Sequence, residues 1–103
     1  ISGCTYTDEQ IAETLKETYK TTGYLLDPHG AVGYRSLLEG LKENEIGVFL
    51  ETAHPAKFKE TVESIIEDDV AIPAKLAAFM KGTKSTVKLS SSFPSFKKYL
   101  MSL

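Results

Sequence analysis

The stretch "IGVFLETAHPAKF", residues 46–58, joins five apolar residues to a polar turn and then to a helix-like pattern. The apolar run, residues 46–50, shows no alternation with polar residues, which is typical of a strand covered on both faces in a parallel sheet. A buried helix segment is the alternative, although Gly47 and the short length count against it. We therefore expect a central strand here, and a strand of that kind needs neighbours.

Local signals place a helix near the start of the chain. Thr7 followed three residues later by Gln10 is a capping box, in which each side chain can accept a bond from a free backbone amide of the other. Apolar residues then recur every four positions until Gly23, which is typical of a helix end. Similar helical patterns are expected in three later segments: residues 58–66, 72–82 and 93–103.

A second helix is expected to begin at Asp27, an N-cap residue that is followed by Pro28 at the first helical position. It should end at about Gly40. Gly30 and Gly33 lie in its first turns, where each glycine weakens a helix by roughly 1 kcal/mol relative to alanine. Either another backbone or a ligand approaches closely there, or the helix packs tightly against a neighbour.

These patterns amount to about five helices and only one strand strong enough to be central. Weaker strand candidates occupy residues 1–6, 24–26 and 85–89. A single parallel strand cannot satisfy its own backbone groups. The sequence therefore predicts an α/β fold with several helices and few parallel strands. Residues 1–103 form one segment whose sheet is incomplete and is completed by a missing part of the protein.

Composition restricts the possible partners. The chain is 42% apolar and 25% charged, as expected for one globular domain. Its net charge of -2 leaves no positive field for nucleic acid or an anionic membrane. A single cysteine cannot form an internal disulfide, and no apolar run approaches the roughly 20 residues that span a bilayer. We therefore expect a cytoplasmic protein, and the first residue, Ile1 rather than methionine, points to a piece of something larger.

Two junctions of similar design hold the candidate site residues. "LLDPHGAVG" (residues 25–33) and "FLETAHPAKF" (residues 49–58) each place a histidine beside a proline where an apolar segment gives way to a helix. Ligands of open parallel sheets bind beyond the carboxyl ends of strands, where helix N-terminal amides can hold anionic groups. The alternative is that Asp27 and His54 only cap helices. Both interpretations are open at this point.

Metal and phosphate binding are two further possibilities. The junctions contain carboxylates and histidines, but their spacing matches no standard zinc pattern, so no metal site is predicted. Lys57 and Lys59 could bind phosphate, whereas a solvated helix face is the alternative for them.

The two junction motifs together resemble the C-terminal part of threonine synthases. The ordered pair D-P-H-x-A-V-G and T-A-H-P-A-K-F, with a helical segment between them, carries this resemblance, and the flanking segments agree over nearly the whole chain. Gly30 departs from the threonine of many relatives. The resemblance implies a pyridoxal-phosphate enzyme of the tryptophan-synthase-like fold. That enzyme is a carbon–oxygen lyase that converts O-phosphohomoserine and water to threonine and phosphate.

The resemblance also implies where the cofactor lies. Thr52 stands where this superfamily places a hydroxyl or thiol against the pyridine nitrogen. A neutral hydroxyl can donate a hydrogen bond to an unprotonated nitrogen, whereas an aspartate would hold a proton there. A strand-end cap is the alternative for Thr52. Asp27, His29, Ala53 and His54 are then expected near the cofactor or in the active-site wall, and none of them is assigned a catalytic role.

Two essential parts of such an enzyme lie upstream of the matching region in the family. These are the Schiff-base lysine and the glycine-rich loop that holds the cofactor phosphate. The chain alone is therefore expected to be inactive, to need the N-terminal portion of the same enzyme, and to self-associate through uncovered apolar edges. The alternative function is a free-standing helical binding module for a small anion or a protein partner.

Overall fold

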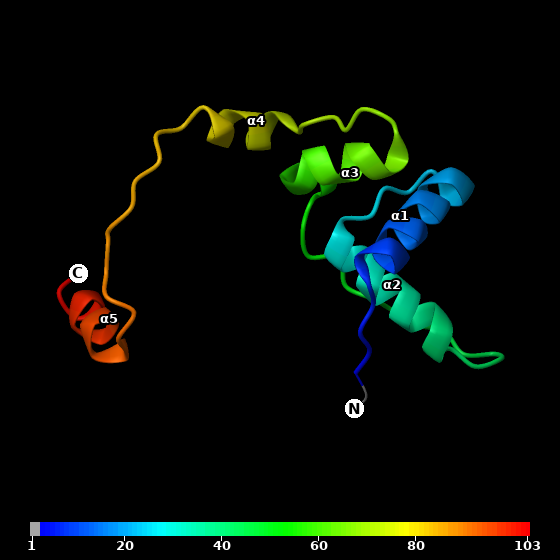
Figure 1. Cartoon of the computed structure of the whole chain (residues 1–103), viewed down its shortest axis with the longest axis horizontal. Helices are drawn as coiled ribbons and strands as arrows, with labels where there is room; N and C mark the ends of the chain where they lie inside the picture. Colours follow the sequence, from blue (N-terminus) through cyan, green and yellow to red (C-terminus); the bar gives the residue numbers. More distant parts are fainter. Residues whose placement is uncertain (1–2) are drawn as a thin grey trace. The chain divides into compact units, whose positions relative to one another are not determined.

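The computed structural model of the chain describes residues 3–103, which divide into two compact units (Figure 1). The first unit ends at Pro73, and the second is Ala74–Leu103. The helices of the first unit are α1 (Asp8–Thr22), α2 (Pro28–Gly40), the short 3-10 helix η1 (Pro55–Phe58) and α3 (Lys59–Ile66). Those of the second are α4 (Ala74–Met80) and α5 (Phe93–Leu100). All the expected helices are therefore confirmed.

Helix α1 begins and ends at the residues that the sequence indicates. The hydroxyl of Thr7 accepts a hydrogen bond from the Gln10 amide at 3.4 Å, and the Gln10 side chain accepts one from the Thr7 amide at 2.9 Å. Gly23 ends the helix with a φ of 72°, a left-handed conformation that costs glycine little. The capping box and the glycine stop are confirmed.

The core of the first unit lies where α1 packs against α2 and α3 (Figure 1). Leu15 of α1 and Val62 of α3 are fully buried, as is Leu26 just before α2. The other buried apolar residues are Ala31, Ala56, Ile66 and Val70. This small core fixes the starts of α2 and η1 next to each other, because Ala31 and Ala56 lie in the first turns of those helices.

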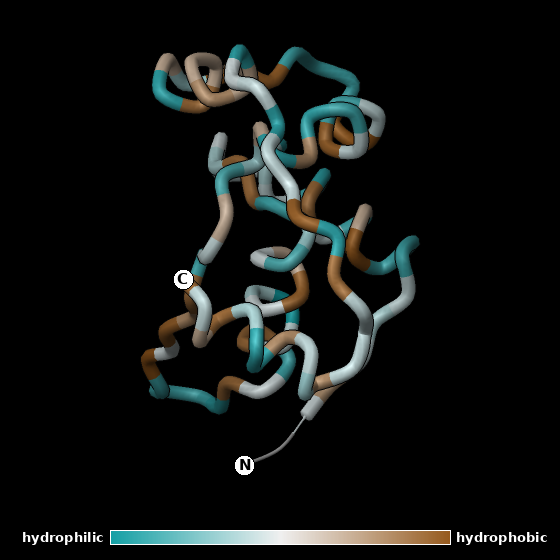
Figure 2. Tube along the Cα trace, turned by 90° about the vertical axis from the view of Figure 1, so that its left-hand side faces the viewer, coloured by the Kyte–Doolittle hydropathy of each residue, from teal (hydrophilic) through white to brown (hydrophobic). Residues whose placement is uncertain are grey.

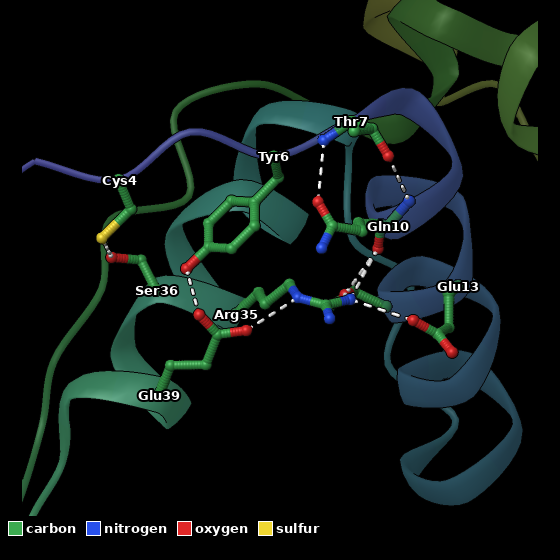
Figure 3. Close-up of polar contacts among 9 residues, drawn as sticks. Cys4, Tyr6, Thr7, Gln10, Glu13, Arg35, Ser36 and Glu39 are labelled. Carbon is green, nitrogen blue, oxygen red and sulfur yellow. Dashed lines mark hydrogen bonds and ion pairs between the residues drawn. The ribbon is translucent and has the colours of Figure 1, made fainter.

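Arg35 of α2 ties that helix to α1 (Figure 3). Its Nη1 donates to Glu13 Oε2 at 3.0 Å and to the Gln10 carbonyl at 3.1 Å. Its Nε donates to Glu39 Oε1 at 2.9 Å, and its guanidinium lies 5.5 Å from the ring centre of Tyr6. The hydroxyl of Tyr6 donates to the second oxygen of Glu39, and this bond, together with burial, raises the pKa of Tyr6 to about 12.

The strand expected at residues 46–50 is not formed, and no strand is assigned within residues 3–103. The α/β prediction is therefore not confirmed. Residues 24–26 and 85–89 are not strands either, and the remaining candidate, residues 1–6, lies partly outside the described residues. The physical reason is that the backbone groups of a strand need a neighbouring strand as hydrogen-bond partner, and residues 3–103 supply none. Residues 46–50 instead run along α2, where the Phe49 ring lies 5.4 Å from that of Tyr34.

The second unit has little core of its own. Its two helices contain no buried residue, although apolar residues recur along them (Figure 2). Ser92 caps α5, and its hydroxyl accepts from the Ser95 amide at 3.4 Å. The apolar face expected on this helix is largely solvent-exposed, with Phe93 at 72% and Leu100 at 50%. Nowhere in residues 3–103 is a helix long and apolar enough to cross a membrane.

Candidate functional site

The structure brings the two junctions together. The backbone amide of Asp27 donates to Glu51 Oε1 at 2.9 Å, across 24 positions of sequence. The ring of His29 packs against that of Phe58, with centroids 5.2 Å apart and planes inclined by 53°. The N-termini of α2 and η1 therefore lie side by side, as the two-junction interpretation requires.

Both capping expectations are also confirmed. The Asp27 carboxyl accepts hydrogen bonds from the His29 amide at 2.8 Å and from His29 Nδ1 at 2.9 Å. Nδ1 of His54 accepts from the Ala56 amide at 3.1 Å, which caps η1. Asp27 is completely buried, whereas His29 and His54 are exposed. Of these three side chains, only those of the two histidines are accessible to solvent.

Thr52 lies on the exposed side of the segment that leads into the second junction. Burial alternates along this segment with a period of two, as in an extended strand. Ile46, Val48 and Leu50 are 96%, 83% and 80% exposed, whereas the residues between them are partly covered. Thr52 continues the exposed series. Its hydroxyl is therefore on the side that the rest of this chain leaves uncovered.

An open hollow of about 520 Å³ lies beside the second junction, and Thr52 is not among its lining residues. Glu51 and Ala53, the residues on either side of Thr52, line it together with His54. Its far side is formed by residues 69–73. Lys59 holds that wall in place, because its ammonium donates to Glu63, to Asp69 at 2.7 Å and to the Val70 carbonyl at 2.7 Å. Lys59 is thus occupied within the fold, and of the two lysines only Lys57 keeps the solvated position.

The carboxyls of Asp27 and Glu51 form the most perturbed pair of this region. Burial alone would raise the pKa of Asp27, but the nearby Glu51 carboxyl and the hydrogen bonds from His29 outweigh it and leave that pKa below its ordinary value. Burial raises the pKa of Glu51, the bond from the Asp27 amide lowers it, and the nearby Asp27 carboxyl raises it again, so that the balance is upward. Of the two carboxyls, Glu51 is therefore the one that takes up a proton first as the pH falls.

The two glycines in the first turns of α2 have a packing explanation. A Cβ on Gly30 would collide with the carboxyl of Glu51, whereas a Cβ on Gly33 would lie 3.7 Å from the Phe49 ring, an ordinary contact. Of the alternatives that the sequence left open, tight packing is observed at Gly30, against the side chain of Glu51, whereas the contact at Gly33 is an ordinary one.

Alanine substitutions at Gly30 and Gly33 should have opposite effects on the free energy of unfolding. Gly33→Ala is expected to stabilise the chain by up to about 1 kcal/mol through helix propensity. Gly30→Ala should instead destabilise it by roughly 1–3 kcal/mol, because the new methyl group overpacks the site of the Glu51 carboxyl. Urea unfolding of both variants measures the difference. In a Glu51→Ala background the Gly30→Ala cost should disappear, and a cost that persists there would contradict the collision.

Glu51 is the residue whose importance the sequence reasoning missed. It entered only among side chains of metal-binding type, and residues 3–103 contain no group of three or more such side chains that could hold a metal ion. The available signals were its place directly before Thr52 and the glycine in the first turn of the facing helix. Neither signal specifies that Gly30 and Glu51 meet.

Comparison with known proteins points to one family. A family model described as "Threonine synthase, C-terminal" matches residues 30–100. The chain is 54% identical over 69 residues to threonine synthase from Buchnera aphidicola subsp. Acyrthosiphon pisum. The aligned region covers 67% of the chain and 16% of that protein. It is 42% identical over 96 residues to the Serratia marcescens enzyme, covering 93% of the chain and 22% of that enzyme.

Solved structures give the same result. Threonine synthase from Escherichia coli superposes with a TM-score of 0.77 at 40% identity, over 92% of this chain and 22% of that one. PLP-bound threonine synthase from Brucella melitensis superposes with a TM-score of 0.68 at 32% identity, over 87% and 19%. The fold is thus that of one part of these enzymes. The chain belongs to the threonine synthase C-terminal family, and it spans about a fifth of the length of these relatives.

Proposed function

We propose that this chain is the C-terminal segment of a threonine synthase, a pyridoxal-phosphate-dependent carbon–oxygen lyase that converts O-phosphohomoserine and water to threonine and phosphate. Family membership and the two junction motifs support this proposal. Activity belongs to the complete enzyme, in which residues 1–103 are one segment of a larger catalytic domain. Without the N-terminal portion the segment is inactive. We place the enzyme in the cytoplasm, in keeping with the single cysteine and the composition.

The observation that carries the proposal is the exposed position of Thr52 at the meeting point of the two junctions. A hydroxyl both donates and accepts hydrogen bonds, so it fits a neutral aromatic nitrogen. When bound, pyridoxal phosphate supplies a sink for electrons during the reaction. Thr52 would hold the pyridine nitrogen by donating a hydrogen bond, which leaves that nitrogen without a proton. Ala53, His29 and His54 would form the adjoining wall, and Asp27 would act beneath it through His29 and Glu51.

The same exposed side would join the sheet of the complete enzyme. Residues 46–50 already alternate between covered and uncovered side chains, and their uncovered side chains are all large and apolar. In the proposed enzyme this segment is a parallel strand whose neighbours come from the N-terminal portion. The exposed apolar residues of α4 and α5 would be covered by that portion too.

A complementation experiment tests the proposed function. The Serratia marcescens enzyme, truncated where its sequence begins to align with this chain, should be inactive, and so should this chain alone. Mixing or co-expressing the two should restore phosphate release from O-phosphohomoserine. A matched mixture with the Thr52→Val chain should restore less activity. If the two parts neither associate nor release phosphate, while the chain alone is a folded monomer that binds small anions, the binding-module alternative is correct.

Without its partner portion, the chain is expected to self-associate. Its uncovered residues include Ile46, Val48, Phe79, Phe93 and Leu103, all at least 72% exposed. Apolar surface of this kind is normally buried at an interface. Sedimentation equilibrium should show a mean mass that rises with concentration above the 11.3 kDa of one chain. A constant mass of one chain across the range would contradict this expectation.

A further inference from the structure

Two carboxyl oxygens are buried without a hydrogen-bond partner where the N-terminus of α2 meets Glu51. Asp27 Oδ2 and Glu51 Oε2 are the buried side-chain oxygens within residues 3–103 for which no hydrogen bond is found. The other oxygen of each carboxyl is engaged. Asp27 Oδ1 accepts from His29, and Glu51 Oε1 accepts from the Asp27 amide at 2.9 Å. The unsatisfied oxygens thus belong to carboxyls that are already tied to each other through a backbone bond.

Two ionised carboxylates cannot remain side by side in such a place. A buried charge without a partner is strongly disfavoured, and two like charges at close range make it worse. One proton removes both problems, because a protonated carboxyl donates an O–H bond to the ionised one. The bond would satisfy both oxygens and leave a single negative charge. His29 then faces that charge through two hydrogen bonds to Asp27.

We propose that Asp27 and Glu51 share one proton and act as a clasp that holds Thr52 against the N-terminus of α2. Glu51 is therefore a positioning residue, since it acts on any ligand only through its neighbour Thr52. The clasp itself follows from the contacts of these two side chains. Its effect on a cofactor rests on the proposed function.

The surroundings support the clasp. Gly30 leaves the space that the Glu51 carboxyl fills, so the helix is shaped to admit it. Burial and the Asp27 carboxyl raise the pKa of Glu51, whereas the nearby Glu51 carboxyl and the hydrogen bonds from His29 lower that of Asp27 despite its burial. The other titratable groups around Glu51 line the two hollows on either side of it. They are Tyr24, Tyr34, His54 and Asp69.

The clasp has a defined pH range. Because the folded chain raises the pKa of Glu51, the stability that Glu51 contributes is complete below its unfolded pKa and is lost as the pH rises through the raised value. Because the pKa of Asp27 is lowered, its contribution is present above its unfolded pKa and is lost as the pH falls through the lowered value. The clasp should therefore be closed in mildly acidic solution and open on the alkaline side of the Glu51 titration.

Nuclear magnetic resonance of the full 103-residue chain tests this directly. Side-chain carboxyl carbons report each titration, and exchange protection of the Asp27 amide reports closure. In the wild-type chain, Glu51 should titrate above the exposed glutamates and protection should fall as it does so. Glutamine is an uncharged match for a protonated glutamate, so Glu51→Gln should keep the amide protected at both ends of the range. Glu51→Ala should lose that protection at every pH.

Asp27→Asn is the reciprocal variant, because asparagine remains a good N-cap and its amide can donate to an ionised Glu51. In this variant, Glu51 should titrate at a lower pH than in the wild type, because burial still raises its pKa but Asp27 no longer does, and the amide at position 27 should stay protected. Titration of wild-type Glu51 in line with the exposed glutamates would overturn the proposal, and so would the same pH-dependent loss of protection in Glu51→Gln. If the separate chain is unfolded, labelling only residues 1–103 within the full-length enzyme gives the same readouts.

These readouts need neither cofactor nor substrate, so they distinguish the clasp from the proposed function. In the full-length enzyme the wild-type kcat should decline on the alkaline side, whereas Glu51→Gln should flatten that limb of the profile. An unchanged limb with a confirmed titration would contradict the positioning of Thr52 by the clasp. If Thr52 substitutions leave kcat unchanged while Glu51 titrates as proposed, the cofactor role of Thr52 is wrong and the clasp is still supported.

Discussion

Replacing Thr52 by valine in the full-length enzyme is expected to lower kcat by roughly 10- to 100-fold. Valine keeps the shape of threonine but removes the hydroxyl, so the pyridine nitrogen would lose its donor. An unsatisfied polar group in a closed site costs about 1–3 kcal/mol, and each 1.4 kcal/mol is a factor of ten in rate. Phosphate release under saturating substrate measures the change.

Serine and aspartate at the same position complete the test. Thr52→Ser retains a hydroxyl and should keep activity within a few-fold of the wild type. Thr52→Asp should hold a proton on the pyridine nitrogen and change the absorption spectrum of the bound cofactor. If the Thr52→Val enzyme has the same kcat as the wild type, Thr52 does not contact the cofactor and serves only as a cap at the end of the strand.

Removing the guanidinium of Arg35 should lower the stability of the chain, although this group lies outside the hydrophobic core. Arg35→Met keeps much of the packing stem but loses the bonds to Glu13, Gln10 and Glu39 (Figure 3). The Arg35 side chain is only 23% exposed, so the loss should exceed that of a surface pair. We expect a decrease of about 2 kcal/mol in the free energy of unfolding, measured with urea, since bonds to charged groups contribute roughly 1.5–3 kcal/mol.

Glu39→Gln is the matched control for this arginine. The Glu39 side chain is 54% exposed, so its ion pair should contribute less than about 1 kcal/mol. Arg35→Lys should fall between the two, because lysine keeps the charge without the planar array of donors. Equal losses in Arg35→Met and Glu39→Gln would show that the bonds across to α1 contribute nothing.

The helix ends were predictable because their causes are local. Thr7 and Gln10, or Asp27 and Pro28, act within one helical turn, so the residues that cause the cap are neighbours in sequence. The sequence showed that the two junctions have a similar design, but it did not show that they are in contact. The bond from the Asp27 amide to Glu51 confirms that they meet.

The remaining features depend on partners far away in sequence or outside the chain. Arg35 reaches residues more than 20 positions earlier, and no short motif marks such a contact. The space beside Gly30 was noticed, but not that Glu51 fills it. The run at residues 46–50 has the composition of a buried strand and yet alternates in exposure, because α2 packs against one side of it. A strand whose neighbours are elsewhere cannot be assigned from this chain alone.

The most direct test of the account is the nitrogen-15 resonance of the cofactor ring in the full-length enzyme, measured with labelled pyridoxal phosphate. A donor hydroxyl at Thr52 predicts the shift of an unprotonated, hydrogen-bonded pyridine nitrogen that moves on Thr52→Val and returns with Thr52→Ser. A protonated ring nitrogen in the wild type, or a resonance that is the same with valine, would contradict it.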